Sequence, residues 1–168
     1  MSAARLRIAG GCQCGAIRYA LHARPTGASI CHCRMCQKAF GSYFAPLAGV
    51  AVADFEVTRG TIACFRSSDE VERGFCRDCG TPLIFHYVGR DDRISVSLGS
   101  LDDPSAIPPE LQYGIESRVP WFAALASLPG DQTTEEEDPA LSGAIAATNH
   151  QHPDHDTAVW PPPDRLKN

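Results

Sequence analysis

Short alternations of apolar and polar residues run through the first hundred positions and predict β-strands. Residues 16–22 alternate so that Ile17, Tyr19 and Leu21 lie on one face, as a half-buried strand requires. A similar alternation predicts a strand at 94–98, and short apolar runs predict others at 42–48, 55–58, 61–66, 71–75 and 82–88. Because Gly, Pro and Asp separate these segments, the pattern favours curled antiparallel sheets over alternating βαβ units.

Helical patterns are scarce. A turn or two is expected at 33–40, and a short helix at 120–125, where Pro120 occupies the first turn. The sequence contains no internal repeat and no glycine-rich phosphate loop. It therefore predicts a mainly β domain with few short helices.

The composition changes after residue 130. Residues 131–168 hold 2 basic and 8 acidic residues, an Ala-rich stretch and a Pro-rich end, whereas residues 1–130 hold 13 basic and 12 acidic residues. A polar segment of this kind buries too little apolar surface to offset the entropy lost on ordering. We therefore expect a folded domain at 1–130 and a flexible acidic tail at 131–168, whose His150, His152 and His155 bind metal only adventitiously.

Length and charge exclude several classes of protein. A chain of 168 residues suits one domain, and no apolar run approaches the ~20 residues that span a bilayer. The first residues lack the apolar segment of a secretory signal, so a cytoplasmic location is expected. Residues 1–130 are nearly neutral and contain one lysine, Lys38, which argues against partners such as nucleic acid or a membrane.

The candidate chemistry is concentrated in the cysteines. Seven of the eight fall into three tight groups: Cys12 and Cys14, then Cys31, Cys33 and Cys36, then Cys76 and Cys79. Disulfide frameworks are typical of short secreted chains, and a thioredoxin-type redox pair lies beside a βαβ unit, so both alternatives fit this sequence poorly. Metal ligation explains the grouping directly, because thiolates a few residues apart wrap one ion and Zn²⁺ is the usual occupant of sulfur-rich sites.

The first and third groups together supply four thiolates, which is a complete tetrahedral set. Each pair is followed at once by a glycine, which allows a tight turn that aims backbone N–H groups at the sulfurs. A closed four-thiolate site adds to folding free energy rather than to catalysis. The sequence therefore predicts a structural zinc on Cys12, Cys14, Cys76 and Cys79.

The middle group supplies three thiolates, which leaves one coordination position open, as in catalytic zinc sites. A sulfur-rich site of this kind suits a thiol as the fourth ligand. The alternative is that His32 or a distant residue closes the site and makes it structural too. Since His32 lies between two ligands in the sequence, we expect it to point away from the ion.

Two residues outside the three cysteine groups, Cys64 and Arg73, also lead to predictions. Cys64 lies in the apolar stretch 62–65 and is expected to be a buried, inert thiol. Arg73 precedes Cys76 by three positions and is expected close to the structural site. There it either balances thiolate charge or faces a substrate carboxylate.

Three stretches of the chain resemble the glutathione-dependent formaldehyde-activating (GFA) family. They are Gly11-Cys12-Gln13-Cys14-Gly15, Cys31-His32-Cys33-x-x-Cys36-x-Lys38, and Arg73-Gly74-Phe75-Cys76-x-x-Cys79-Gly80-x-Pro82-Leu83. The resemblance extends over roughly residues 8–125 and includes the stretch 117–122. Three cysteine groups with matching flanks make it specific, whereas a single Cys-x-x-Cys would be a weak signal.

The resemblance implies a β-tent fold of short coiled antiparallel sheets around two zinc ions per chain. It implies the same division into a structural zinc on the first and third groups and a catalytic zinc on Cys31, Cys33 and Cys36. The implied activity is that of an S-(hydroxymethyl)glutathione synthase, which joins the thiol of glutathione to formaldehyde and is classed as a carbon–sulfur lyase for the reverse direction. The alternative function is a non-catalytic zinc-stabilised β domain that binds a protein partner. A zinc-ribbon nucleic-acid binder is disfavoured by the near-neutral charge.

Overall fold

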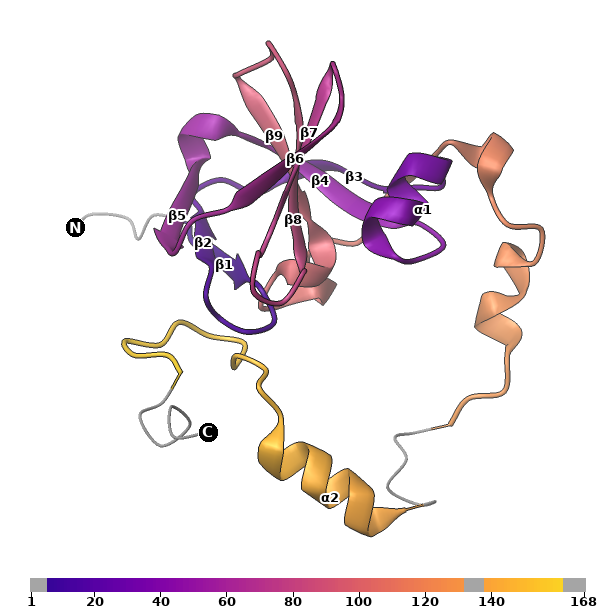
Figure 1. Cartoon of the computed structure of the whole chain (residues 1–168). Helices are drawn as coiled ribbons and strands as arrows, with labels where there is room; N and C mark the ends of the chain where they lie inside the picture. The colour runs from indigo at the N-terminus through magenta and orange to yellow at the C-terminus, as the bar shows by residue number, and fades with distance from the viewer. Residues whose placement is uncertain (1–5, 132–137, 162–168) are drawn as a thin grey trace.

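Two β-sheets make up most of the structure, a computed structural model that describes residues 6–131 and 138–161 (Figure 1). The smaller sheet has three antiparallel strands in the order β1-β2-β5, with bounds Ile8–Gly11, Arg18–Leu21 and Phe55–Arg59. The larger sheet has seven strands in the order β10-β3-β4-β9-β8-β7-β6. Their bounds are Leu111–Tyr113, Thr26–Cys31, Ala45–Ala51, Arg93–Ser97, Pro82–Tyr87, Val71–Phe75 and Ala63–Ser68. The predicted mainly β fold is confirmed.

Helices are short and peripheral. The helix α1 (Arg34–Phe40) follows β3 and packs on β4, as the sequence predicts for 33–40. The helix expected at 120–125 is a six-residue 3-10 helix at Phe122–Ser127, and shorter 3-10 turns lie at Val52–Asp54, Leu98–Ser100, Pro104–Ala106 and Ile115–Ser117. Among the described helices, none is long and apolar enough to cross a bilayer.

The strand predictions are correct at seven positions and miss three strands. Each predicted segment overlaps a strand, but β1, β3 and β10 were not predicted. All three residues of β10 are exposed, and this strand exists because it pairs with β3 in parallel. Such a strand shows no apolar alternation, because backbone hydrogen bonds to a neighbour hold it rather than burial.

The core lies between the two sheets. Tyr19 and Leu21 of β2 are fully buried against Leu83 of β8 and Val96 of β9. The Tyr19 hydroxyl is 2.8 Å from the Ser100 hydroxyl, so the polar end of this ring is paired inside the core. The strand β2 is thereby anchored at the centre of the fold.

The expectation that β2 is half-buried is wrong, because its other face is covered as well. Arg18 on that face is 3% exposed. Its guanidinium donates to both carboxylate oxygens of Asp102, at 2.6 and 2.5 Å, and to Asp156 at 3.0 Å. A buried arginine requires such partners, and one of them comes from the C-terminal segment, which sequence alternation does not reveal.

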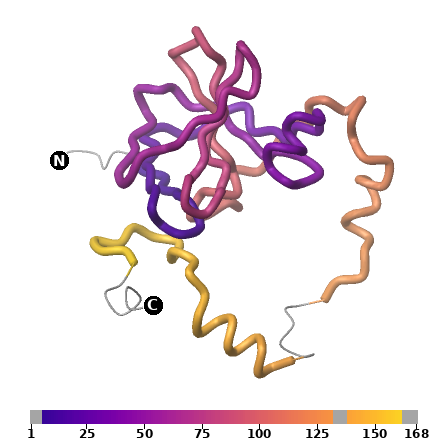
Figure 2. Tube along the Cα trace, viewed as in Figure 1, coloured from indigo at the N-terminus to yellow at the C-terminus, as the bar shows by residue number. Residues whose placement is uncertain are grey.

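The tail contains a helix that the sequence analysis did not predict. The helix α2 (Pro139–Thr148) begins after Asp138, whose carboxylate accepts a hydrogen bond from the N–H of Leu141 at 3.0 Å. None of its residues is buried. After α2 the chain returns to the domain near β1 (Figures 1 and 2).

Candidate metal centres

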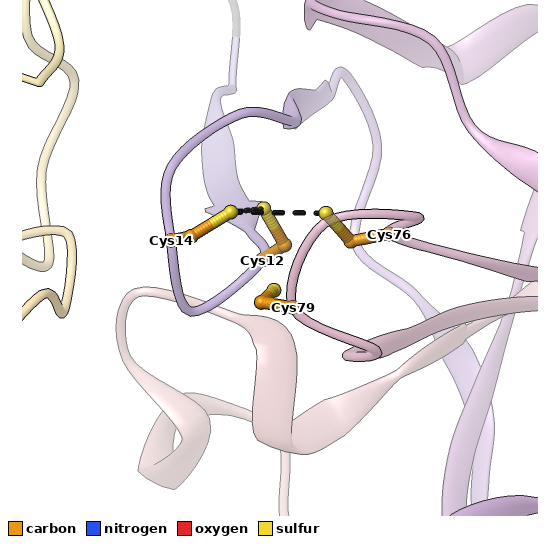
Figure 3. A group of neighbouring side chains, drawn as sticks. All are labelled: Cys12, Cys14, Cys76 and Cys79. Atoms are coloured by element: carbon orange, nitrogen blue, oxygen red, sulfur yellow. Dashed lines mark hydrogen bonds between the residues drawn. The ribbon is translucent and has the colours of Figure 1, made fainter.

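Four cysteines from two distant parts of the chain lie together (Figure 3). Cys12 and Cys14 lie in the turn after β1, and Cys76 and Cys79 lie in the turn between β7 and β8. Their sulfurs lie within 4.8 Å of one another. The Sγ of Cys14 is 3.6 Å from that of Cys12 and 3.8 Å from that of Cys76. Four ligands at the usual Zn–S length of ~2.3 Å have neighbouring sulfurs ~3.8 Å apart, so this spacing suits a tetrahedral ion.

The two turns are built alike. Gly15 and Gly80 have φ of 75° and 80°, in the left-handed region. Their N–H groups donate to the carbonyls of Cys12 and Cys76, at 3.0 and 2.9 Å. The chain therefore reverses tightly around each pair of sulfurs, as the glycines predicted.

Hydrogen bonds to sulfur tune these thiols. Burial raises the pKa of Cys12, although the N–H of Ile17 donates to its Sγ at 3.2 Å and acts in the other direction. Burial alone would also raise the pKa of Cys79, but the hydroxyl and N–H of Thr81 outweigh it and lower that pKa to about 6. A cysteine binds metal as the thiolate. The hydrogen-bond donors around this cluster therefore favour the form of the side chain that binds metal.

The remaining group, Cys31, Cys33 and Cys36, also has its sulfurs within 4.8 Å of one another. Cys31 ends β3, Cys33 precedes the first residue of α1, and Cys36 is buried on that helix. The N–H of Cys36 donates to the Sγ of Cys33 at 3.4 Å, so one candidate ligand also caps the helix. We refer to these three residues as the three-cysteine cluster and to the other group as the four-cysteine cluster.

The thiols of the three-cysteine cluster differ in acidity. Burial raises the pKa of Cys31 to about 12. Burial acts on Cys33 in the same direction, but the N–H of Cys36 and the neighbouring thiols outweigh it and lower the pKa of Cys33. A divalent cation would favour the thiolate form at all three positions.

His32 lies outside the three-cysteine cluster. Its ring is fully buried, with its centroid 4.6 Å from that of Phe122, and its Nε2 is 2.9 Å from the side-chain oxygen of Gln112. Within the described ranges, the three-cysteine cluster includes no fourth His, Cys, Asp or Glu ligand atom. This arrangement favours the open-site interpretation over the alternative in which His32 closes the site.

The expected position of Arg73 near the four-cysteine cluster is wrong. Its Nη2 lies 3.5 Å from the Sγ of Cys36, in the three-cysteine cluster. In the sheet, Arg73 pairs with Phe65 on one side and Phe85 on the other, and Phe85 packs on the cluster that contains Cys36. Strand register therefore moves Arg73 away from its sequence neighbour Cys76.

The expected burial of Cys64 is also wrong. Cys64 is exposed, and its strand β6 is the edge of the seven-stranded sheet. An edge strand has one neighbour only, so an apolar run there does not imply coverage on both sides. Cys64 belongs to neither cysteine cluster.

The C-terminal segment 151–161 contacts the turn that carries Cys12 and Cys14. The N–H of His152 donates to the carbonyl of Gln13 at 2.7 Å, and the indole N–H of Trp160 donates to the carbonyl of Cys14. The His152 ring, 4.8 Å from the Trp160 ring, leaves no room for a side chain at Gly15. We call residues 151–161 the C-terminal strap.

Ionic contacts also hold the strap. Asp156 pairs with Arg18 at 3.0 Å and with Arg7 at 2.6 Å. Burial alone would raise the pKa of Asp156, but these hydrogen bonds outweigh it and lower that pKa. Burial lowers the pKa of His152. The sequence analysis did not predict these contacts, and the signal that could have pointed to them was the presence of Trp160 and His152 in the tail.

Comparisons with known proteins give one structural match and one family match. A comparison with curated proteins finds no match. A solved structure described as a Rhodobacter sphaeroides protein, a structural genomics target, is 21% identical, with a TM-score of 0.51 over 62% of this chain and 98% of that chain. This similarity supports the fold alone. The sequence profile of the family described as glutathione-dependent formaldehyde-activating enzyme (GFA) matches residues 7–117. The chain therefore belongs to the GFA family.

Proposed function

We propose that this protein binds two zinc ions and catalyses addition of a thiol to an aldehyde, with glutathione and formaldehyde as the substrates that its family name suggests. The product is an S-hydroxymethyl adduct, and the enzyme class is carbon–sulfur lyase for the reverse reaction. The observation that carries the proposal is the difference between the clusters: four sulfurs in one and three in the other.

The four-cysteine cluster holds the structural ion in this proposal. Its ligands join the turn after β1 to the turn between β7 and β8, so one ion links the two sheets. Four thiolates fill the tetrahedron and leave no position for substrate. Removal of that ion is expected to disrupt the fold.

The three-cysteine cluster holds the catalytic ion. When bound there, zinc supplies a Lewis acid with an open position that keeps a thiol deprotonated near neutral pH. The thiolates of Cys31, Cys33 and Cys36 fix the place of reaction, and the guanidinium of Arg73 beside Cys36 partly balances their negative charge.

The reaction itself requires little from the side chains. The substrate thiol loses its proton, and its sulfur forms a bond to the aldehyde carbon as the carbonyl π bond breaks. The oxygen then takes up a proton. The product therefore contains all the atoms of the thiol and the aldehyde, and no oxidant or reductant is needed. Most of the rate gain comes from activating the sulfur and holding it beside the carbonyl.

Two measurements test the proposal. The first measures the metal content of the purified full chain while a mild chelator is added. Circular dichroism of the same samples reports whether the fold persists. We expect two zinc ions per chain, one of which leaves while the fold persists. The second is exchange NMR of glutathione and formaldehyde with and without protein, in which we expect faster adduct exchange.

Matched variants sharpen the second measurement. Cys33→Ser removes a ligand of the three-cysteine cluster and should abolish the acceleration, whereas Cys64→Ser changes an exposed cysteine outside both clusters and should keep it. No acceleration by the two-zinc protein would refute the named reaction. Simultaneous loss of both ions with unfolding would instead favour the alternative of a zinc-stabilised binding domain.

A further inference from the structure

A cavity of about 370 Å³ opens beside the three-cysteine cluster, between α1 and the sheet. Its walls include three cationic side chains and a largely apolar surface, contributed by Arg34, Met35 and Lys38 of α1, Phe65 and Ser67 of β6, and Arg73 of β7. None of the described residues that line it is acidic. The cavity therefore combines positive potential with a wall suited to a carbon chain.

Arg73 is the buried member of this cationic set, with 7% of its surface exposed. Its Nε donates to the Ser67 hydroxyl at 3.2 Å, and its Nη2 donates to the Sγ of Cys36 at 3.5 Å. The guanidinium carbon lies 5.0 Å from the ring centroid of Phe85. These contacts fix the plane of the guanidinium.

The third nitrogen of this guanidinium is unpaired. Nη1 of Arg73 is buried and has no hydrogen-bond partner among the described residues. A buried cationic donor without an acceptor costs free energy, so such groups are rare in folded proteins and typical of ligand sites. A fixed guanidinium with one free edge favours a carboxylate or another oxyanion as partner.

We propose that this cavity binds a thiol that carries a carboxylate, with the carboxylate accepting a hydrogen bond from Nη1 of Arg73 and the sulfur directed to the three-cysteine cluster. The inference rests on the proposed function and assigns to it the residue that recognises the carboxylate of the substrate thiol. Because Nη2 of the same guanidinium contacts Cys36, the carboxylate lies close to the sulfurs of the cluster. Arg34 and Lys38, both exposed, add positive charge at the mouth.

Isothermal titration calorimetry on the zinc-loaded full chain tests this without any turnover. The probes are 3-mercaptopropionate, the uncharged propane-1-thiol and the cationic cysteamine. Charge-assisted hydrogen bonds to a buried anion should make 3-mercaptopropionate bind about 10- to 100-fold more tightly than propane-1-thiol. Cysteamine should bind most weakly, because it brings a like charge to the three cations.

Variants assign the preference to Arg73. Arg73→Gln should reduce the preference for 3-mercaptopropionate to within about threefold, since it removes the charged donor. Arg73→Lys keeps the positive charge but not the planar guanidinium. This variant should therefore retain only part of the preference for 3-mercaptopropionate. Arg66→Gln, an exposed arginine on the neighbouring strand outside the cavity lining, is the matched control and should bind like the wild type.

The outcomes separate this inference from the proposed function. Equal binding of charged and neutral thiols by the wild type, or an unchanged preference in Arg73→Gln with both ions bound, would overturn the carboxylate site alone. If none of the three thiols binds, the proposed function fails together with the carboxylate site. Zinc content is measured for each variant, and if Arg73→Gln loses an ion, the wild-type comparison and Arg73→Lys decide the question.

Discussion

The guanidinium of Arg73 lies 3.5 Å from the sulfur of Cys36, although 37 positions separate the two residues in the chain. Arg73 comes from β7, which ends beside the four-cysteine cluster, and Cys36 comes from α1, which carries part of the three-cysteine cluster. One short strand thus runs between the two candidate metal centres. A change at either centre can be measured separately, because they share no ligand.

The two clusters should respond differently to loss of one ligand. Cys76→Ser breaks the four-cysteine cluster and should unfold or severely destabilise the domain, since structural zinc contributes ~10–16 kcal/mol in small zinc peptides. Cys33→Ser should leave the domain folded with one zinc fewer. Thermal unfolding of both variants is monitored by circular dichroism, and the zinc content of the same samples is measured. Equal loss of structure in both variants would contradict the division of roles.

Cys64 should be the reactive thiol of the metal-loaded protein. It is exposed, whereas the seven other cysteines belong to the two clusters. Partial desolvation and the negative charge of nearby Glu72 raise the pKa of the Cys64 thiol. Its reaction with a thiol reagent should therefore be slow at neutral pH and faster as the pH rises. Labelling with a thiol reagent should give one equivalent in the native protein and all eight after chelation and denaturation.

The control for this labelling is Cys64→Ser, which should give no fast equivalent in its metal-loaded form. Several reactive thiols in a protein that contains two zinc ions would show that the clusters do not protect their cysteines.

Gly15→Ala and Gly80→Ala should differ in cost although both glycines have positive φ. An added Cβ at Gly80 meets no atom within 4 Å, so only backbone strain of ~1 kcal/mol is expected there. At Gly15 the Cβ would meet the His152 and Trp160 rings, so the variant should displace the C-terminal strap as well.

Tryptophan fluorescence in a Trp121→Phe background reports on Trp160 alone, since the chain has two tryptophans. A shift to longer wavelength is expected for Gly15→Ala and not for Gly80→Ala. The same spectrum in both variants would indicate that the strap does not pack on this turn in solution.

Docking of the strap should weaken in acid. The pKa of Asp156 is lowered from its ordinary value of 3.8 because the hydrogen bonds from Arg18 and Arg7 outweigh its burial. A carboxyl group with a lowered native pKa stabilises the native state above pH ~4 and loses that effect as the pH falls through the native pKa. Asp102, which also pairs with Arg18, and His152 within the strap are the other titratable groups at this contact.

Asp156→Asn should therefore reduce stability at pH 6–7 by about 1 kcal/mol or less, because the carboxylate is 39% exposed and partly screened. The difference between wild type and variant should be constant above pH ~4 and shrink as the pH falls from there towards the lowered native pKa. Denaturant unfolding across this pH range measures it, and a difference that does not shrink in acid would assign the effect to something other than the ion pairs.

Local sequence determined the elements whose cause is local. Alternation of apolar and polar residues predicted two strands, short apolar runs between turn residues predicted five more, and the spacing of seven cysteines predicted three groups of candidate ligands. Cysteines two or three residues apart lie close enough to bind the same ion, so their grouping follows from chain geometry. A fully exposed strand such as β10 leaves no alternation and could not be found in this way.

Tertiary structure decided the partners of residues whose contacts are distant in the chain. Strand register placed Arg73 beside Cys36 rather than near Cys76, and the position of β6 at the sheet edge left Cys64 exposed. The sequence determined three groups of two, three and two cysteines, and the fold joined the first and third groups into one cluster of four. Which cation faces the thiolates of each cluster depends on strand pairing, which is set by packing across the whole domain.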